Sequence, residues 1–197
     1  MSAIWFTSDT HFRHRHMAAT HPSGGWRPFA TIDEHDQYLI DQWNAVVSPL
    51  DQVWHLGDVG LGDEDEVLNI IRRLNGRKHL IAGNHDPVWP GHRQAHRHQR
   101  KWLEVFESVQ AFARRRVGNH DVMLSHLPYQ GDHVEQERYT QFRLRDQGDW
   151  LICGHVHDLW DIKDRQINVG VDVREWKPIL LDEIVKIIRD DYRELSA

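Results

Sequence analysis

Apolar and polar positions along the first 85 residues alternate between two periods. Three short apolar runs end in polar residues, which is typical of buried strands. They are AIWFTSD (residues 3–9), QVWHLGD (52–58) and KHLIAG (78–83). Apolar side chains recur at helical spacing over residues 31–47, where Thr31 and Glu34 form a capping box, and over 63–76, which opens with acidic residues. The alternation predicts an α/β arrangement with right-handed crossovers.

The second half of the chain has a different pattern. Four further strand-like runs follow one another with few helical segments between them, so we expect antiparallel pairing there. They are SVQAFARRRV (residues 108–117), VMLSH (122–126), DWLICGH (149–155) and QINVGVD (166–172). Residues 182–195 predict a closing amphipathic helix with Ile184, Ile188 and Tyr192 on one face. HPSGGWRP (21–28) and DPVWPGH (86–92) are expected to be loops beside the strand ends.

Length and composition fit a single domain covering residues 1–197. The 40% hydrophobic content argues against disorder, and the net charge of −6 argues against a nucleic-acid-binding module. The one cysteine, Cys153, excludes a disulfide framework and a thiolate metal cage, and we expect it in the core. The N-terminus lacks the pattern of a signal peptide and no apolar run approaches the ~20 residues of a membrane span, so a soluble, cytoplasmic protein is expected.

Side chains that can bind a metal or move a proton follow five of the predicted strands at their carboxyl ends. They are Asp9, His11, Asp58, Asn84, His85, His126, His155 and His157. In open α/β sheets this edge is where sites form, so we expect these side chains to converge. The alternation of side chains along a strand would also point Asp9 and His11 the same way, and likewise His155 and His157.

The tetrapeptide GNHD occurs at residues 83–86 and again at 118–121. The second copy lies between two predicted strands and has the composition of a tight hairpin turn. Six residues separate His120 from His126, which at ~3.3 Å per residue is roughly 20 Å. If His126 binds a metal, Asn119 and His120 therefore cannot, and only the first copy is expected to be chemical.

The ligand types indicate which metals would bind. Imidazole, carboxylate and amide groups without a thiolate suit Mn, Fe, Zn, Co or Ni, with Mn favoured. Seven ligands are too many for one tetrahedral site and suit two open sites that share a carboxylate, for which Asp58 is the natural bridge. Such metals lie ~3.5–4 Å apart and generate a bridging hydroxide that can attack phosphorus. Asp86, next to His85, would fix the tautomer of that imidazole.

The ordered set SDTH, GD, GNHD, SH and GHVH across residues 7–157 resembles the signature of the calcineurin-like metallophosphoesterase family. SDTHFRHRHM, VWHLGDV and INVGVDV followed by KPI are further similar to a small, single-domain bacterial and phage branch. The resemblance implies an α/β (α+β) fold in which two mixed β-sheets pack as a sandwich flanked by helices.

The resemblance also implies residue roles. One metal would be held by Asp9, His11, Asp58 and His157, and the other by Asp58, Asn84, His126 and His155. His85 would face the phosphate and either donate a proton to the leaving oxygen or stabilise charge on it, and Asp86 would orient His85. The residues expected to contact substrate are His14, Asn84 and His85, although His14 could equally be a surface histidine.

The expected function is a binuclear metal-dependent phosphodiesterase that acts on nucleotide-type or 2′,3′-cyclic nucleotide substrates. The alternatives are a phosphomonoesterase or nucleotide pyrophosphatase of the same fold, and a non-catalytic, metal-stabilised binding or scaffold protein. A third alternative is a binder of nucleic-acid ends that uses Arg114–Arg116. The expected partner is a small phosphoester substrate, and no membrane is expected.

Three further histidines have weaker claims to a role in the site. His55 is expected to support a ligand or to lie in the core rather than to bind a metal. His92 and His96 have the i, i+4 spacing of a helical metal clip, but a solvated face is the favoured interpretation.

Overall fold

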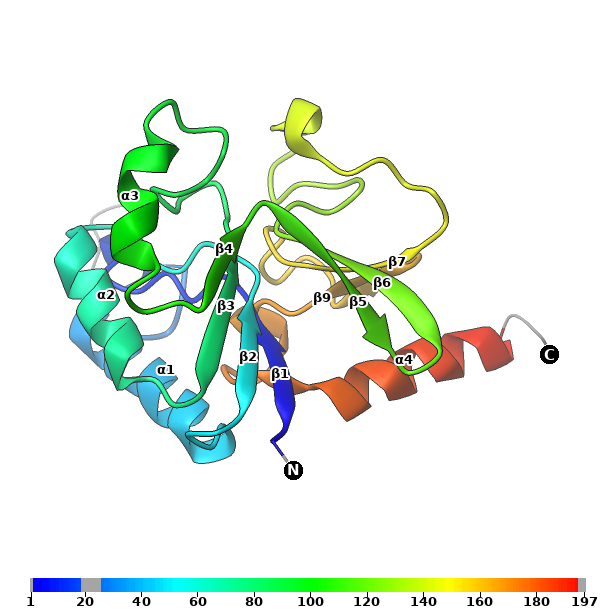
Figure 1. Ribbon diagram of the computed structural model, residues 1–197, viewed down its shortest axis with the longest axis horizontal. Helices are drawn as coiled ribbons and strands as arrows, with labels where there is room; N and C mark the ends of the chain where they lie inside the picture. The colour runs from blue at the N-terminus through cyan, green and yellow to red at the C-terminus, as the bar shows by residue number, and fades with distance from the viewer. Residues whose placement is uncertain (1, 19–25, 195–197) are drawn as a thin grey trace.

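The computed structural model describes residues 2–18 and 26–194 and contains two five-stranded sheets (Figure 1). The first has the order β10-β1-β2-β3-β4 and the second β5-β6-β7-β9-β8. The strands are β1 (Ile4–Thr7), β2 (Gln52–His55), β3 (Arg77–Ile81), β4 (Ser108–Gln110), β5 (Phe112–Val117), β6 (His120–Ser125), β7 (Trp150–Cys153), β8 (Ile162–Lys163), β9 (Gln166–Asn168) and β10 (Ile179–Leu180). The helices are α1 (Ile32–Val46), α2 (Glu64–Arg73), α3 (Ala95–Trp102) and α4 (Leu181–Glu194). This confirms the expected sandwich of two mixed sheets with flanking helices.

The first sheet has the parallel order that the strand–helix alternation predicts. Strands β1 to β4 are parallel neighbours, and β10 closes the sheet antiparallel to β1. Helices α1 and α2 form the connections, and both start where expected. Thr31 accepts a hydrogen bond from the Glu34 amide at 3.1 Å, and Asp63 caps α2 through the amides of Asp65 and Glu66.

The expectation of antiparallel pairing in the second half is only partly met. The pairs β5–β6 and β8–β9 are antiparallel, but β6–β7 and β7–β9 are parallel. The connection from β6 to β7 crosses over without an α-helix and contains only a short 3-10 turn at Thr140–Phe142. Hydrophobic periodicity could not reveal this crossover, because its segments carry no helical stripe.

The run SVQAFARRRV also differs from expectation, because it is two strands rather than one. Its first part, β4, pairs with β3 in the first sheet, and its second part, β5, pairs with β6 in the second. The chain passes from one sheet to the other at Ala111, and the two strands meet at the bend between the labels β4 and β5 in Figure 1. This passage joins the two layers of the sandwich.

Apolar side chains fill the space between the two sheets and cover both faces of the first one. The core between the sheets includes Phe6, Leu56, Ile81, Leu124 and Ile152, and α4 adds Ile184 and Ile188 to it. The predicted third member of that helix face, Tyr192, lies outside the residues whose side chains are described. The other face of the first sheet packs against α1 and α2 through Leu39, Trp43, Leu68 and Ile71.

Helix α3 carries no apolar stripe that would reveal it in the sequence, because only Ala95 and Trp102 of its residues are buried. The indole of Trp102 donates to Glu64 at 2.7 Å and ties this helix to α2. None of the helices in the part of the chain that the structure describes is long and apolar enough to cross a membrane.

The second GNHD copy forms the hairpin that its composition indicates. Val117 pairs with His120 across the antiparallel β5–β6 ladder, so Gly118 and Asn119 form the turn. Gly118 has a φ of 57°, and a Cβ built there would come no closer than 3.4 Å to Val185. The turn therefore requires glycine for its backbone conformation and not for lack of space.

The variant Gly118→Ala should lower the free energy of unfolding by about 1–2 kcal/mol, because a left-handed conformation is disfavoured for any residue with a Cβ. Urea denaturation followed by circular dichroism measures the difference. Asn119→Ala is the matched control, since Asn119 is exposed and its φ is not positive. Equal stability of wild type and Gly118→Ala would contradict this account of the turn.

Candidate metal centre

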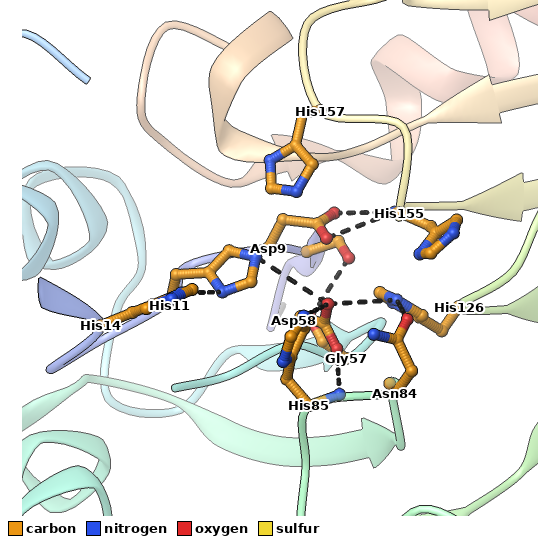
Figure 2. A network of polar contacts seen from close by, with 12 residues as sticks. Asp9, His11, His14, Gly57, Asp58, Asn84, His85, His126, His155 and His157 are labelled. Atoms are coloured by element: carbon orange, nitrogen blue, oxygen red, sulfur yellow. Dashed lines mark hydrogen bonds and ion pairs between the residues drawn. The ribbon is translucent and has the colours of Figure 1, made fainter. Parts of the chain in front are cut away.

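The predicted site residues converge at one edge of the two sheets (Figure 2). Each follows the carboxyl end of a strand: Asp9 and His11 follow β1, Asp58 follows β2, Asn84 and His85 follow β3, His126 follows β6, and His155 and His157 follow β7. Apart from His85, whose side chain is 37% exposed, these residues are almost completely buried. The expectation that residues at the carboxyl ends of the strands converge is therefore met, because these residues are neighbours in space.

The backbone at these residues is unusual. Left-handed φ angles of 57°, 50°, 53°, 73° and 50° occur at Asp9, His11, Asp58, His155 and His157. These residues lie beyond the strand ends, so the strand alternation expected to align Asp9 with His11, and His155 with His157, does not operate. Backbone strain of this kind clusters at functional sites, where the surrounding structure holds it in place.

Two glycines allow the loops after β2 and β3 to touch. A Cβ at Gly57, whose φ is 92°, would collide with the backbone of Gly83. A Cβ at Gly83 would collide with the backbone amide and the carboxylate of Asp58. The glycines of GD and GNHD are therefore required because the two backbones are in direct contact, and this contact brings Asp58 beside Asn84 and His85.

The side chains form two groups that could each hold a metal ion. In Asp9, His11 and His157, and again in Asp58, His126 and His155, the potential ligand atoms lie within 4.8 Å of one another. Asp58 also joins the two groups, because its Oδ2 lies 3.8 Å from His11 Nε2 and 3.4 Å from His126 Nε2. Asp58 therefore lies between the two groups.

Electrostatics around Asp58 favour positive charge. Burial opposes ionisation of this carboxylate, but the neighbouring imidazoles, His126 foremost, outweigh it and hold the pKa of Asp58 well below its usual range. Burial likewise lowers the pKa of His126, yet Asp58 and Asp9 raise it to about 9. His126 Nδ1 donates to the Leu56 carbonyl at 2.7 Å, which leaves Nε2 facing the Asn84 Oδ1 at 3.1 Å. The lone pairs of His126 Nε2 and Asn84 Oδ1 point toward each other, so a proton or a cation must lie between these two atoms.

The residues fit divalent cations. His11 Nε2 is buried and has no hydrogen-bond partner, although it faces Asp58. Burial holds the pKa of His11 well below its usual range, so the ring is neutral, as a metal ligand must be. Its other nitrogen, Nδ1, lies 3.1 Å from Nδ1 of His14. A protonated Nδ1 on His11 that donates to His14 leaves the lone pair of His11 on Nε2, directed into the centre.

Asp86 has a different role from the one expected. Its carboxylate accepts hydrogen bonds from the backbone amides of Gly83, Asp58 and Val59 at 2.8, 3.0 and 2.9 Å. The backbone amide of Asp86 donates to the Gly83 carbonyl and closes a tight turn. This turn directs the side chain of Asp86 back beneath Asp58. Asp86 is therefore engaged with the backbone of the two loops rather than with the imidazole of His85.

A buried arginine that sequence reasoning missed holds one side of the centre. All five donor positions of Arg27 are used: Nε and Nη2 bind Asp172, Nη1 reaches the Thr10 carbonyl and His35, and Nη2 also reaches the Asp9 carbonyl. The carboxylate of Asp172 in turn lies 3.2 Å from His157 Nδ1. This contact fixes the ring of His157 so that Nε2 faces Asp9 and His11.

A second network, centred on Asp132, holds His155. The fully buried carboxylate of Asp132 lies 2.8 Å from Arg138, 3.4 Å from Arg143 and 3.2 Å from His155 Nε2. Asp132, His133 and His155 also have metal-ligand spacing. Because two guanidinium groups already neutralise Asp132, this cluster anchors the loop between β6 and β7 and orients His155.

His55 and His92 contact the loops that carry the candidate ligands. His55 is fully buried, contacts Thr10 Oγ1 at 2.9 Å and accepts from the Gly57 amide at 3.2 Å, so it belongs to the core beneath the loops. His92 Nε2 donates to the Asn84 carbonyl at 3.0 Å. Helix α3 begins only at Ala95, so His92 and His96 do not form a pair on one helix.

One sequence signal could have revealed Asp172, because it follows β9 just as the other site residues follow their strands. Arg27 lies in the Gly- and Pro-rich loop predicted over residues 21–28, of which 21–25 lie outside the described residues, and Asp132 lies in the long β6–β7 connection. Nothing in their local patterns distinguishes them from solvated loop residues. Their roles arise from contacts between segments distant in sequence.

Fold and site together describe an α/β protein of two mixed sheets with candidate metal-binding groups at its strand ends. The model of the calcineurin-like phosphoesterase superfamily domain matches residues 3–171. The chain is 40% identical to the gene 66 protein of Mycobacterium phage L5 over 98% of both proteins. It is 32% identical to an uncharacterized protein of Methanocaldococcus jannaschii over 95% of this chain and 92% of that protein.

A solved structure of a protein of unknown function from Aquifex aeolicus has 26% sequence identity and a TM-score of 0.68, covering 95% of this chain and all of that one. The chain belongs to the calcineurin-like phosphoesterase superfamily. Membership supports a hydrolase that acts on phosphoester bonds, and it confirms the family inferred from the ordered motifs.

The variant Asp172→Asn should weaken the binding of Mn²⁺ by about 10-fold or more, because carboxylates that orient ligand imidazoles contribute at this level. Calorimetric titration of the purified protein with Mn²⁺ measures the affinity. Asp146→Asn is the control, since Asp146 pairs with Arg165 at the surface. An unchanged titration for Asp172→Asn would show that the carboxylate does not act through His157.

Proposed function

We propose that this chain is a binuclear metal-dependent phosphodiesterase that hydrolyses nucleotide-type phosphodiesters, 2′,3′-cyclic nucleotides among them. The observation that supports the proposal best is the meeting of two carboxylate–imidazole groups at Asp58, with the partly exposed ring of His85 beside them. The preference for diesters rests on the likeness to small members of the family that lack a large capping domain.

The proposed ligand assignment is the one that the family resemblance implies, and the two groups with metal-ligand spacing support it. Asp9, His11, Asp58 and His157 would hold one divalent cation, and Asp58, Asn84, His126 and His155 would hold the second, with Mn favoured over Fe, Zn, Co and Ni. When bound, the cations supply positive charge against the phosphoryl oxygens and lower the pKa of a water molecule. The chain contributes buried carboxylates and imidazoles whose orientation is already fixed.

His85 is the proposed proton donor to the leaving oxygen. Its backbone amide donates to Asp58 Oδ1 at 2.9 Å, which fixes the residue, while its Nε2 lies 4.0 Å from Asp58 Oδ2. The ring is therefore held at the edge of the centre on a side that substrate can reach. A phosphate placed beside Asp58 would lie within reach of this imidazole, which can protonate the oxygen that departs.

His14 is a proposed substrate contact next to His85, and their ring centroids are 5.9 Å apart. Burial and the neighbouring His85 lower the pKa of His14 to about 4, so this ring is neutral. With the His11 proton on Nδ1, as metal binding through Nε2 would require, the Nδ1 of His14 is the acceptor and the proton of His14 lies on Nε2. His14 would therefore offer one N–H to a phosphate oxygen without adding charge.

The structure disfavours two of the alternative functions. Non-catalytic scaffolds of this family tend to lack ligands or the proton donor, and this chain has a candidate residue for each of them. The binder of nucleic-acid ends would need free arginines, but Arg114 and Arg116 pair with Asp121, and Arg115 lies 4.8 Å over the ring of Trp54. The monoesterase and pyrophosphatase alternatives share the same centre, so substrate comparison separates them.

Replacing His85 by Ala should reduce the turnover of an aryl phosphodiester with Mn²⁺ by about 10²- to 10⁴-fold, because a positioned general acid contributes at this level. The same variant should bind Mn²⁺ as the wild type does, whereas Asn84→Ala should lose metal affinity as well as turnover. The second GNHD copy supplies matched controls, His120→Ala and Asn119→Ala, which should keep wild-type turnover. Full activity in His85→Ala or Asn84→Ala would refute the assigned roles.

A substrate panel at equal Mn²⁺ concentration tests the class of substrate. Cyclic nucleotides should be turned over faster than mononucleotides, oligonucleotides or dinucleoside polyphosphates, and a chelator should abolish all turnover. Faster release of phosphate from mononucleotides would favour the monoesterase instead. Nucleotide binding that survives chelation and weakens steeply with salt would favour the nucleic-acid-end binder.

A further inference from the structure

A cavity of about 180 Å³ adjoins one side of the centre. It is lined by Trp26, Arg27, His157, Asp158 and Asp172, so one of its walls is a candidate metal ligand. Pockets for drug-sized ligands have volumes of ~300–1,000 Å³, and this smaller space suits a single planar ring system. Because His157 both lines the cavity and belongs to one of the two candidate metal-binding groups, the cavity adjoins the place proposed for the phosphate.

Trp26 forms an exposed aromatic wall of this cavity. Its side chain is 60% exposed, which is unusual for so large an apolar group. Its ring meets the rings of His157 and His133 edge to face, with centroids 5.3 and 5.7 Å apart. The adjacent Arg27 is only 2% exposed and anchored by five side-chain hydrogen bonds, so the indole is attached to a fixed point of the backbone.

The charges of the cavity indicate which part of a substrate it accepts. Arg27 is already neutralised by Asp172, and the further charged group on the wall is the exposed carboxylate of Asp158. A phosphate would be repelled there, while an uncharged group with N–H or O–H donors would be accepted. An aromatic surface beside a hydrogen-bond acceptor suits a nucleobase and its ribose.

We propose that Trp26 is the surface on which the base of the nucleotide substrate stacks, and that Asp158 accepts a hydrogen bond from the same nucleoside. This inference deepens the proposed function and rests on it for the position of the phosphate. It names specificity-determining residues on the side of the centre opposite to His85 and His14.

Equilibrium binding of AMP and of ribose phosphate to the Mn²⁺-loaded protein tests the proposal without turnover. Calorimetry should show that the wild type prefers AMP, and Trp26→Ala should lose roughly 10-fold to 100-fold in AMP affinity while its affinity for ribose phosphate stays the same. Trp26→Phe should keep most of the preference, because it restores an aromatic face. Asp158→Asn should weaken AMP binding less than Trp26→Ala does.

Phe142 is the matched control, since it is an exposed aromatic side chain that contacts Trp89 in another cavity beside His126. Phe142→Ala should bind AMP as the wild type does. The proposal is overturned if Trp26→Ala keeps the preference for AMP, if Phe142→Ala loses it, or if the wild type shows none. Failure of the phosphodiesterase proposal would be separate: turnover would be absent while the Trp26-dependent preference was still measured.

Discussion

Two buried carboxylates, Asp9 and Asp58, set the main electrostatic constraint on this structure. Both are almost completely inaccessible to water, and burying an ionised carboxylate costs several kcal/mol unless charge and hydrogen bonds compensate. The His155 amide donates to Asp9 at 3.1 Å, and imidazoles surround Asp58. The arrangement is most stable with positive charge in the middle, which protons on imidazoles supply when cations do not.

Keeping these carboxylates together requires a strained backbone. A left-handed conformation costs roughly 1–2 kcal/mol at each residue that has a Cβ, and it occurs at five of the seven candidate ligands. The strain persists because Asp86 binds three backbone amides beneath Asp58 and because Gly57 and Gly83 let two loops touch. The apolar core between the sheets supplies the stability that this edge of the sheets lacks.

The positions of the ligands could be predicted from the sequence because each follows a strand with a clear apolar pattern. The apolar run of each buried strand shows where that strand ends. Because neighbouring strands are parallel, their carboxyl ends lie at the same edge of the sheet. The networks around the ligands could not be predicted in the same way. Arg27 and Asp172 are separated by 145 residues, and a Gly- and Pro-rich loop gives no local signal that its arginine is buried.

Sequence proximity also misled in specific cases. Asp86 adjoins His85 in the chain, but a tight turn directs its carboxylate to the backbone on the other side. The run from Ser108 to Val117 has a continuous strand pattern although it serves two sheets, because side-chain periodicity does not record which partner a strand has. Which neighbouring strand each part pairs with is determined only by the packing of the two sheets.

The arrangement of rings across the centre suggests how a substrate would be oriented. Trp26 contacts His157, His157 stacks on His11 with centroids 5.1 Å apart, and His11 meets His85 at 5.5 Å. A nucleotide whose base lies on Trp26 would therefore present its phosphorus near the middle and its far ester oxygen toward His85. For a linear diester in that orientation the departing oxygen belongs to the group beyond the phosphate, so the nucleoside on Trp26 keeps the phosphate as a monoester. In a 2′,3′-cyclic nucleotide both ester oxygens belong to the same ribose, so the nucleoside on Trp26 keeps the phosphate whichever of them departs. The same order of rings would then determine both which base-bearing part is held and which ester bond is cleaved.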